Sequence, residues 1–228
     1  MNKLLKISLI TFCFIILAGT KVPVIGQVAV RAVGIDGGWY SPSLDYWKDI
    51  SRMSNWGHKF SGGIYGRAFL EIRLVKPVSV RIGVGYWSQT RSQGNITWGN
   101  ETRKDELRLS LIPVTFDALA ELNIESLSPI GFYGGIGGGI NFIQMKFTRT
   151  PSISPGTSEG TSGRDYIGFL LAGVNIPMAS GLATALEFRY VFGKYVQESY
   201  DPVQAIYEND VSITGPQITL ALKYMFED

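Results

Sequence analysis

The alternation of apolar and polar residues is the feature that most constrains the fold of this chain. In residues 78–89 (VSVRIGVGYWSQ), 181–192 (GLATALEFRYVF) and 216–226 (PQITLALKYMF), nearly every second side chain is large and apolar, and most of the others are polar or small. Successive side chains of a strand point to opposite faces of a sheet, whereas a helix repeats every 3.6 residues. The pattern therefore predicts strands with one apolar and one polar face.

Further segments bring the predicted number of strands to eight. They are residues 28–40, 60–75, 105–120, 130–147 and 165–177. In the third of these, the alternation changes phase at Ile112–Pro113, and because proline cannot donate a hydrogen bond to a neighbouring strand, we expect a bulge or a strand irregularity there. The last of these segments is apolar on both faces, so its pattern assigns no outer face.

The connections between these strands alternate between short and long. Short connections fall at 75–77, 121–129 and 177–181, and long ones rich in small polar residues fall at 41–59, 88–104, 148–164 and 194–213. In an outer-membrane barrel, short turns face the periplasm and long loops face outward. Aromatic residues near the strand ends would then form two girdles at the lipid–water boundaries, with Phe60, Tyr86, Tyr166 and Phe192 outside and Phe132, Tyr224 and Phe226 inside.

The first 26 residues differ from the rest of the chain. A basic start (MNKLLK) precedes the apolar run ISLITFCFIILAG, which at about 13 residues is too short to cross a bilayer as a helix. Val24 and Gly26 follow where a signal peptidase accepts small residues. We therefore expect residues 1–26 to be a cleaved secretory signal peptide and residues 27–228 to be one barrel domain. The alternative is an uncleaved N-terminal anchor.

Removal of this segment would change two properties of the chain. It carries Cys13, the only cysteine, and three lysines without any acid, so the formal charge of +2 would become −1. The basic isoelectric point therefore gives no reason to expect a nucleic-acid partner.

These features together resemble the small eight-stranded outer-membrane barrels of the OmpA/OmpX/OmpW-like superfamily over residues 27–228. Members end with a small residue followed by aromatics three and five positions later, here Ala221, Tyr224 and Phe226. Alanine replaces the usual glycine, and two acidic residues follow the last aromatic. The resemblance implies an all-β, eight-stranded, antiparallel up-and-down transmembrane barrel in a Gram-negative outer membrane. It also implies contact with outer-membrane lipid and lipopolysaccharide, and recognition of the final strand by the barrel-assembly machinery.

Residues 130–142 (IGFYGGIGGGINF) contain six glycines and raise the question of a phosphate-binding loop. Ile140 stands where a dinucleotide-binding motif needs its third glycine, and no Lys-Ser/Thr pair ends the stretch. We interpret the segment as a strand whose inward glycines make room for large side chains from opposite strands.

Charged residues on the polar faces are expected to point into the barrel. They are Arg67, Glu71, Arg73, Arg81, Arg108, Glu187, Arg189 and Lys223. Charges inside a narrow barrel need partners, so Glu71 and Glu187 are expected to bridge the basic residues. The set could form a structural plug. Alternatively, since basic residues outnumber acids in it, it could form a gated pore or an anion site.

The sequence offers little for catalysis, cofactors or metals. Some barrels of this superfamily are lipid-modifying enzymes that use a histidine and a serine, but His58 is the only histidine here, and no matching motif surrounds it or Ser61. One histidine and a single cysteine in the signal segment also give no basis for a metal site. We expect no enzymatic activity and no cofactor.

The first long connection is the most distinctive candidate for contact with a surface ligand. Its Tyr46, Trp47 and Trp56 are of the type favoured in binding hot spots, although they could equally pack on the barrel rim. The role favoured by the sequence is structural, or surface interaction through the long loops. The alternatives are a narrow channel for small or hydrophobic molecules, a component of a secretion or assembly apparatus, and a lipid-modifying enzyme.

Overall fold

The computed structural model describes residues 29–45, 62–98, 100–122, 130–179, 181–201 and 205–226. The described strands are β1 (Ala29–Tyr40), β2 (Gly63–Val75), β3 (Val78–Trp98), β4 (Glu101–Leu122), β5 (Gly131–Pro151), β6 (Thr157–Ala179), β7 (Leu182–Asp201), β8 (Ala205–Ser212) and β9 (Gly215–Met225). In the part of the chain that is described, no helix is long and apolar enough to cross a membrane.

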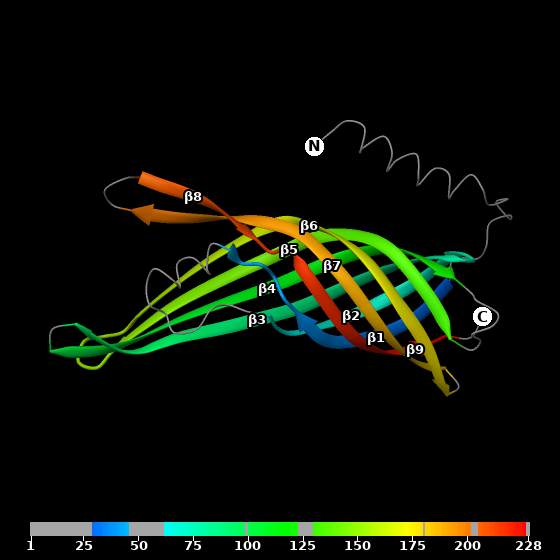
Figure 1. Cartoon of the computed structure of the whole chain (residues 1–228), viewed down its shortest axis with the longest axis horizontal. Coiled ribbons are helices and arrows are strands. Elements are labelled where there is room, and N and C mark those ends of the chain that lie inside the picture. Colours follow the sequence, from blue (N-terminus) through cyan, green and yellow to red (C-terminus); the bar gives the residue numbers. More distant parts are fainter. Residues whose placement is uncertain are drawn as a thin grey trace.

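Eight of these strands close into one antiparallel ring (Figure 1). Consecutive strands pair from β1 to β7, β7 pairs with β9, and β9 pairs with β1. Strand β8 pairs with β7 alone among the described strands and precedes β9 after only Ile213 and Thr214, so the two form one interrupted strand. The predicted eight-stranded antiparallel barrel is therefore confirmed.

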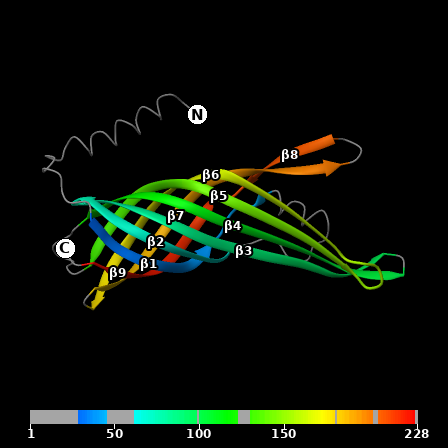
Figure 2. The same cartoon turned by 180° about the vertical axis from the view of Figure 1, so that it is seen from behind.

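The ring closes with a stagger that tilts its strands. We can measure this stagger by moving from each residue to its partner on the next strand, once around the ring. A path that starts at Trp87 returns to the same chain segment at Pro77, which is ten residues away. The path runs through Trp87, Tyr65, Gly38, Thr219, Glu187, Gly173, Tyr133, Glu121 and Pro77. Such a stagger requires strands that tilt against the barrel axis, and the oblique strands are visible from both sides (Figure 2).

Most of the long connections expected after β3, β5 and β7 are not loops. Strands β3 and β4 extend to Trp98 and Glu101, β5 and β6 to Pro151 and Thr157, and β7 and β8 pair from Lys194 to Asp201. The long connections predicted over 88–104, 148–164 and 194–213 are therefore largely paired strands, because polar residues can pair as strands where water covers their faces. The extensions project far beyond the ring (Figure 1).

The inside of the barrel changes character along its length. Within the ring, apolar side chains such as Val114 and Phe116 point outward and are exposed, while Asp117 points inward. Beyond it, Leu107 and Leu111 point inward and are buried. The apolar face therefore turns from outside to inside although the strand keeps its phase, which is the pattern expected if lipid surrounds the ring and water surrounds the extensions.

This inversion explains the change of phase at Ile112–Pro113, where a bulge or a strand irregularity was expected. The pairing of β4 with β5 continues through both residues without a register shift. The pairing of β4 with β3 omits both residues and resumes in the same register, so the irregularity is present without a bulge. The change of phase in the sequence follows the change of surroundings along the strand.

The predicted aromatic girdles fall on the outer surface where they are described. Tyr86, Tyr166 and Phe192 are exposed towards the extensions, and Tyr224 and Phe226 are exposed at the opposite end. Phe132 is half-buried, and Phe60 lies outside the described residues.

Candidate functional site inside the barrel

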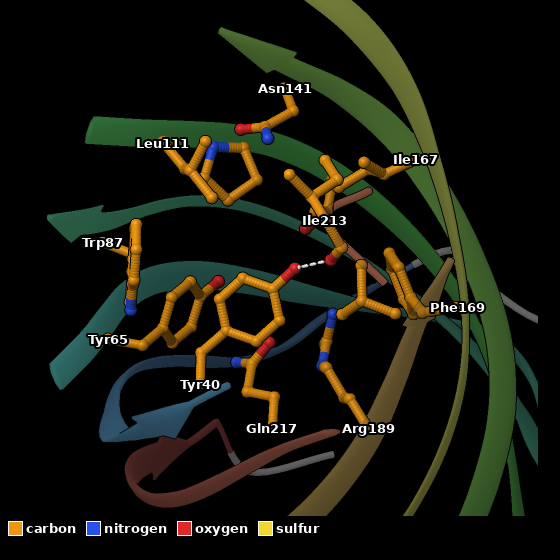
Figure 3. A pocket seen from close by; sticks show the side chains of 13 residues that line it. Tyr40, Tyr65, Trp87, Leu111, Asn141, Ile167, Phe169, Arg189, Ile213 and Gln217 are labelled. Carbon is orange, nitrogen blue, oxygen red and sulfur yellow. Dashed lines mark hydrogen bonds between the residues drawn. The ribbon is translucent and has the colours of Figure 1, made fainter. Parts of the chain in front are cut away.

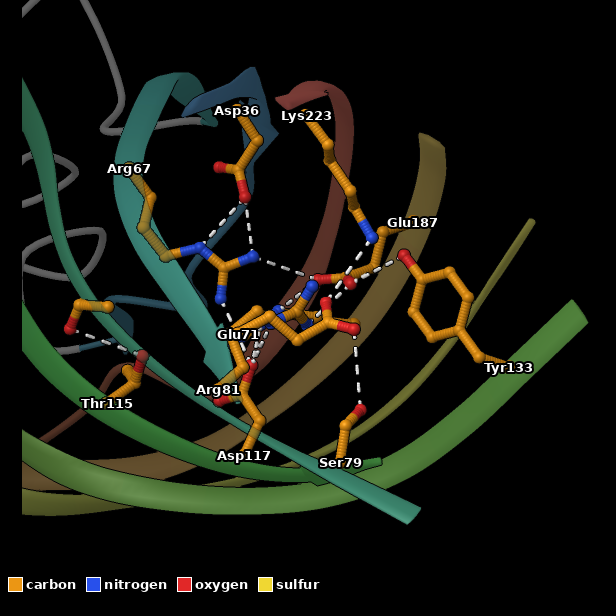
Figure 4. A network of polar contacts seen from close by, with 12 residues as sticks. Asp36, Arg67, Glu71, Ser79, Arg81, Thr115, Asp117, Tyr133, Glu187 and Lys223 are labelled. Atoms are coloured by element: carbon orange, nitrogen blue, oxygen red, sulfur yellow. Dashed lines mark hydrogen bonds and ion pairs between the residues drawn. The ribbon is translucent and has the colours of Figure 1, made fainter. Parts of the chain in front are cut away.

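A network of buried charged side chains crosses the interior of the ring. Arg67 donates to Asp36 on the neighbouring strand at 2.8 Å from Nε and 2.5 Å from a terminal guanidinium nitrogen. The same guanidinium contacts Asp117 and Glu187, each at 3.2 Å. Since β1, β2, β4 and β7 carry these residues, one arginine links four strands across the barrel (Figure 4).

Two carboxylates act as centres of this network. Asp117 accepts from Arg81 at 2.7 Å and from Arg189 at 2.5 Å, in addition to Arg67. Glu187 accepts from Arg81 and Arg189 at 2.6 Å each. Glu187 also accepts from the hydroxyl of Tyr133 at 2.8 Å. Each carboxylate therefore faces three guanidinium groups in a buried space, where hydrogen-bonded pairing is needed to offset lost hydration.

A second group of ions lies next to these centres. Glu71 contacts Arg31 at 3.0 Å and Lys223 at 3.6 Å, and the Ser79 hydroxyl donates to it at 3.4 Å. Lys223 also donates to Asn175 at 2.9 Å. Arg31 forms a further ion pair with Glu121.

The two groups together are balanced in charge. Five cations, Arg31, Arg67, Arg81, Arg189 and Lys223, face five acids, Asp36, Glu71, Asp117, Glu121 and Glu187. The prediction did not include Arg31, Asp36, Asp117 or Glu121, and these residues bring the acids of the two groups level with the cations. A balanced network gives no net positive field to attract an anion.

The glycines of the barrel make room for this packing, as the sequence suggested for residues 130–142. A Cβ atom at Gly137 would overlap the ring of Phe169, which is buried and lies 4.4 Å from the guanidinium carbon of Arg189. A Cβ at Gly83 would lie 2.9 Å from Cδ of Arg67. Large inward side chains therefore fit only because their neighbours lack side chains.

The interior beyond the charges is apolar and aromatic. Tyr40, Tyr65 and Trp87 pack edge to face, and the Tyr40 hydroxyl donates to the carbonyl of Ile213 (Figure 3). A cavity of about 20 Å³ lies among these residues and Arg189. That volume corresponds to about one water molecule.

The structure brings six of the eight predicted inward residues together in the network. Glu71, Arg67, Arg81, Glu187, Arg189 and Lys223 are all buried in the network. Arg73 is half-buried on β2 opposite Ser79, on the same face as Arg67 and Glu71. Arg108 points outward and is exposed, so its placement inside the barrel was wrong. The misplacement follows from the inversion of the pattern on β4, where its leucine neighbours point inward.

The other predicted residues divide between described and undescribed parts. Ala221 points inward and is buried, whereas Tyr224 and Phe226 point outward and pack edge to face with ring centroids 5.2 Å apart. Tyr46, Trp47, Trp56, His58 and the expected signal peptide, residues 1–26, lie outside the described residues. Among the described residues, no group of three or more metal-ligating side chains occurs.

Asp36 and Asp117 could have been found from the sequence. Asp36 is next to the outward-pointing Ile35, so alternation places Asp36 on the inward face. Two glycines follow Asp36, and because they have no side chains the alternation of apolar and polar residues in β1 is harder to recognise. Asp117 lies between outward Phe116 and Ala118, beyond the expected bulge, which obscured its face.

Comparisons with known proteins support the fold. No protein-family model matches the sequence, and no curated protein matches it. Among solved structures, the outer membrane protein OprG from Pseudomonas aeruginosa is similar at a TM-score of 0.54 and 12% identity, covering 87% of this chain and 97% of that one. Neisserial surface protein A is similar at a TM-score of 0.49 and 12% identity, covering 90% of this chain and 100% of that one. The chain thus has the fold of the eight-stranded bacterial outer-membrane barrels.

Proposed function

We propose that this protein is an integral outer-membrane barrel with a closed interior, whose rigid outer hairpins serve surface interaction or a structural role. The observation that carries the proposal is the buried network in which Arg67 and Glu187 meet across the barrel. Ions that neutralise each other in a narrow interior occupy the space through which a solute would have to pass.

The outer hairpins support the second part of the proposal. The carboxylate of Glu101, at the start of β4, accepts from the backbone N–H groups of Ile153 and Ser154 at 3.0 and 2.7 Å. Closer to the ring, Asp105 accepts a hydrogen bond from Arg149 at 3.1 Å. Two neighbouring hairpins are therefore fastened to each other near their tips, which limits the conformational entropy lost when a partner binds.

Electrical recording from planar bilayers tests the closed interior. We expect purified, folded protein to give no steady openings, and the double variant E187A/R189A, which removes two large side chains from the centre of the network, to conduct measurably. A variant with the outward change E106A serves as the control. Steady, large openings of the unmodified protein would contradict the proposal.

The alternatives make different demands on the molecule. A channel for hydrophobic molecules needs an open apolar path, whereas the cavity between Tyr40 and Arg189 holds about 20 Å³. If the protein were a lipid-modifying enzyme, lipid A isolated from cells with the gene would differ in structure from lipid A isolated from cells without it. A component of a secretion apparatus would co-purify with its partners.

A further inference from the structure

The outer edge of the lipid-facing surface can be placed from exposed aromatics. On the outward faces of β3, β5 and β6, the last large apolar side chains described are Tyr86, Phe142 and Tyr166, which are 46%, 40% and 78% exposed. Beyond them, the described outward positions of these strands are polar or glycine. Aromatic residues in this position mark the boundary between hydrocarbon and headgroups.

The first outward charges beyond this boundary are cations on three neighbouring strands. They are Arg108 on β4, Lys146 on β5 and Arg164 on β6, and all three are exposed. Towards the extensions, Arg164 occupies the next outward position after Tyr166 on β6. On β5, Lys146 lies two outward positions beyond Phe142. We call these three residues the boundary cations.

The contacts of the boundary cations leave their charges uncompensated. Arg108 and Lys146 are paired residues on adjacent strands, an arrangement of like charges that destabilises a sheet. Arg108 donates to the Ser88 hydroxyl at 3.3 Å and to the Tyr86 hydroxyl at 2.9 Å, neither of which is charged. In the described structure, no carboxylate forms an ion pair with any of the three cations.

Other outward cations of the extensions differ in this respect. Lys104 lies 3.8 Å from Glu106, and Lys194 lies 2.5 Å from Asp210. On the described outward positions of β4, β5 and β6 beyond the boundary, Glu106 is the one acid. Arg108 and Lys146 are therefore adjacent positive charges just beyond the boundary, and Arg164, which pairs with Phe142, adds a third charge closer to the apolar surface.

We propose that the boundary cations bind the phosphate groups of a phosphorylated glycolipid in the outer leaflet, with the Tyr86 hydroxyl at the base of the site. A guanidinium and an ammonium are both common phosphate ligands, and a shared anion would relieve the repulsion between Arg108 and Lys146. The acyl chains of such a lipid would lie along the apolar surface below Tyr86 and Phe142, so position and charge select a lipid phosphate over a soluble one.

Titration of detergent-soluble, short-chain lipid A into folded protein in a zwitterionic detergent tests the site. We expect R108Q/K146Q to bind bis-phosphorylated lipid A about 25-fold more weakly than the unmodified protein, at about fivefold for each cation near an anionic surface. Variant K104Q/K194Q removes the same charge from paired outward positions and should bind like the unmodified protein. Lipid A without phosphates should bind all three proteins equally.

Three results would overturn the proposal. One is equal affinity of R108Q/K146Q and the unmodified protein for the phosphorylated lipid. Another is an equal loss in K104Q/K194Q, which would indicate a general effect of charge. The third is full competition by inorganic phosphate at concentrations matching the lipid, which would indicate a site for soluble anions. Because the exchanged side chains are exposed, folding should persist, and a gel-mobility shift on boiling checks it.

Discussion

Arg67 on β2 and Glu187 on β7 meet 3.2 Å apart inside the barrel, although 120 residues separate them in the chain and neither strand neighbours the other. The contact exists only because the ring closes. Pairing between neighbouring strands does not require closure of the barrel, whereas this contact does.

Removing one charge from this network should destabilise the barrel. We expect E187Q to lower the free energy of unfolding in detergent micelles by about 3–5 kcal/mol, because three buried guanidinium groups lose an ionic partner. The double variant E187Q/R189Q should recover part of that loss, since it restores the charge balance. Urea titration followed by tryptophan fluorescence measures both. A loss in the double variant equal to or larger than that in E187Q would argue against charge balance as the cause.

Inward glycines should tolerate side chains only where space exists. A Cβ atom at Gly85 would lie 2.8 Å from Cζ of Tyr65 and closer to its hydroxyl, so G85A should cost about 1–3 kcal/mol of stability. Gly163 has no atom within 4 Å of that position, and G163A should leave stability unchanged. In a double-mutant cycle, Y65L should remove most of the cost of G85A. Additive effects would show that the ring of Tyr65 is not the obstacle.

The fastening of the two hairpin tips should depend on pH. Hydrogen bonds from the Ser154 and Ile153 backbones hold the pKa of the Glu101 carboxyl below its usual value. A depressed pKa means that the contact is present at neutral pH and is lost as the pH falls through the folded-state value. Hydrogen exchange should show protection of the Ile153 and Ser154 amides at pH 7 that disappears under acidic conditions. Variant E101A should lack it at every pH, whereas E106A should keep it.

The final aromatic should affect assembly more than stability. Phe226 and Phe188 are similarly exposed to lipid, at 43% and 47%, but only Phe226 belongs to the C-terminal pattern with Ala221 and Tyr224. We expect F226A to reach its folded, heat-modifiable form several-fold more slowly in cells than F188A, and both folded variants to unfold at similar denaturant concentrations. Equal assembly rates would show that Phe226 does not act as an assembly signal.

The change of the apolar face of β4 from outside to inside is a feature that the sequence alone does not predict. Alternation fixed the strand, but the side chain directions of Leu107 and Arg108 depend on whether lipid or water surrounds that part of it. The same residue spacing therefore predicts opposite faces on the two sides of Ile112–Pro113, and Arg108 was assigned to the wrong one. Burial in the folded barrel resolves the choice.

By itself, the sequence determined the strands, the antiparallel ring and most of the inward charges, because alternation is a local property of the chain and the bilayer permits few solutions. Only the tertiary structure decided which ions meet. The contact of Arg67 with Glu187 depends on ring closure and stagger, which bring together residues whose separation in the chain gives no indication of contact. The pairing of Arg67 with Asp36 and of Arg108 with Lys146 depends on the register between neighbouring strands, which alternation alone does not fix.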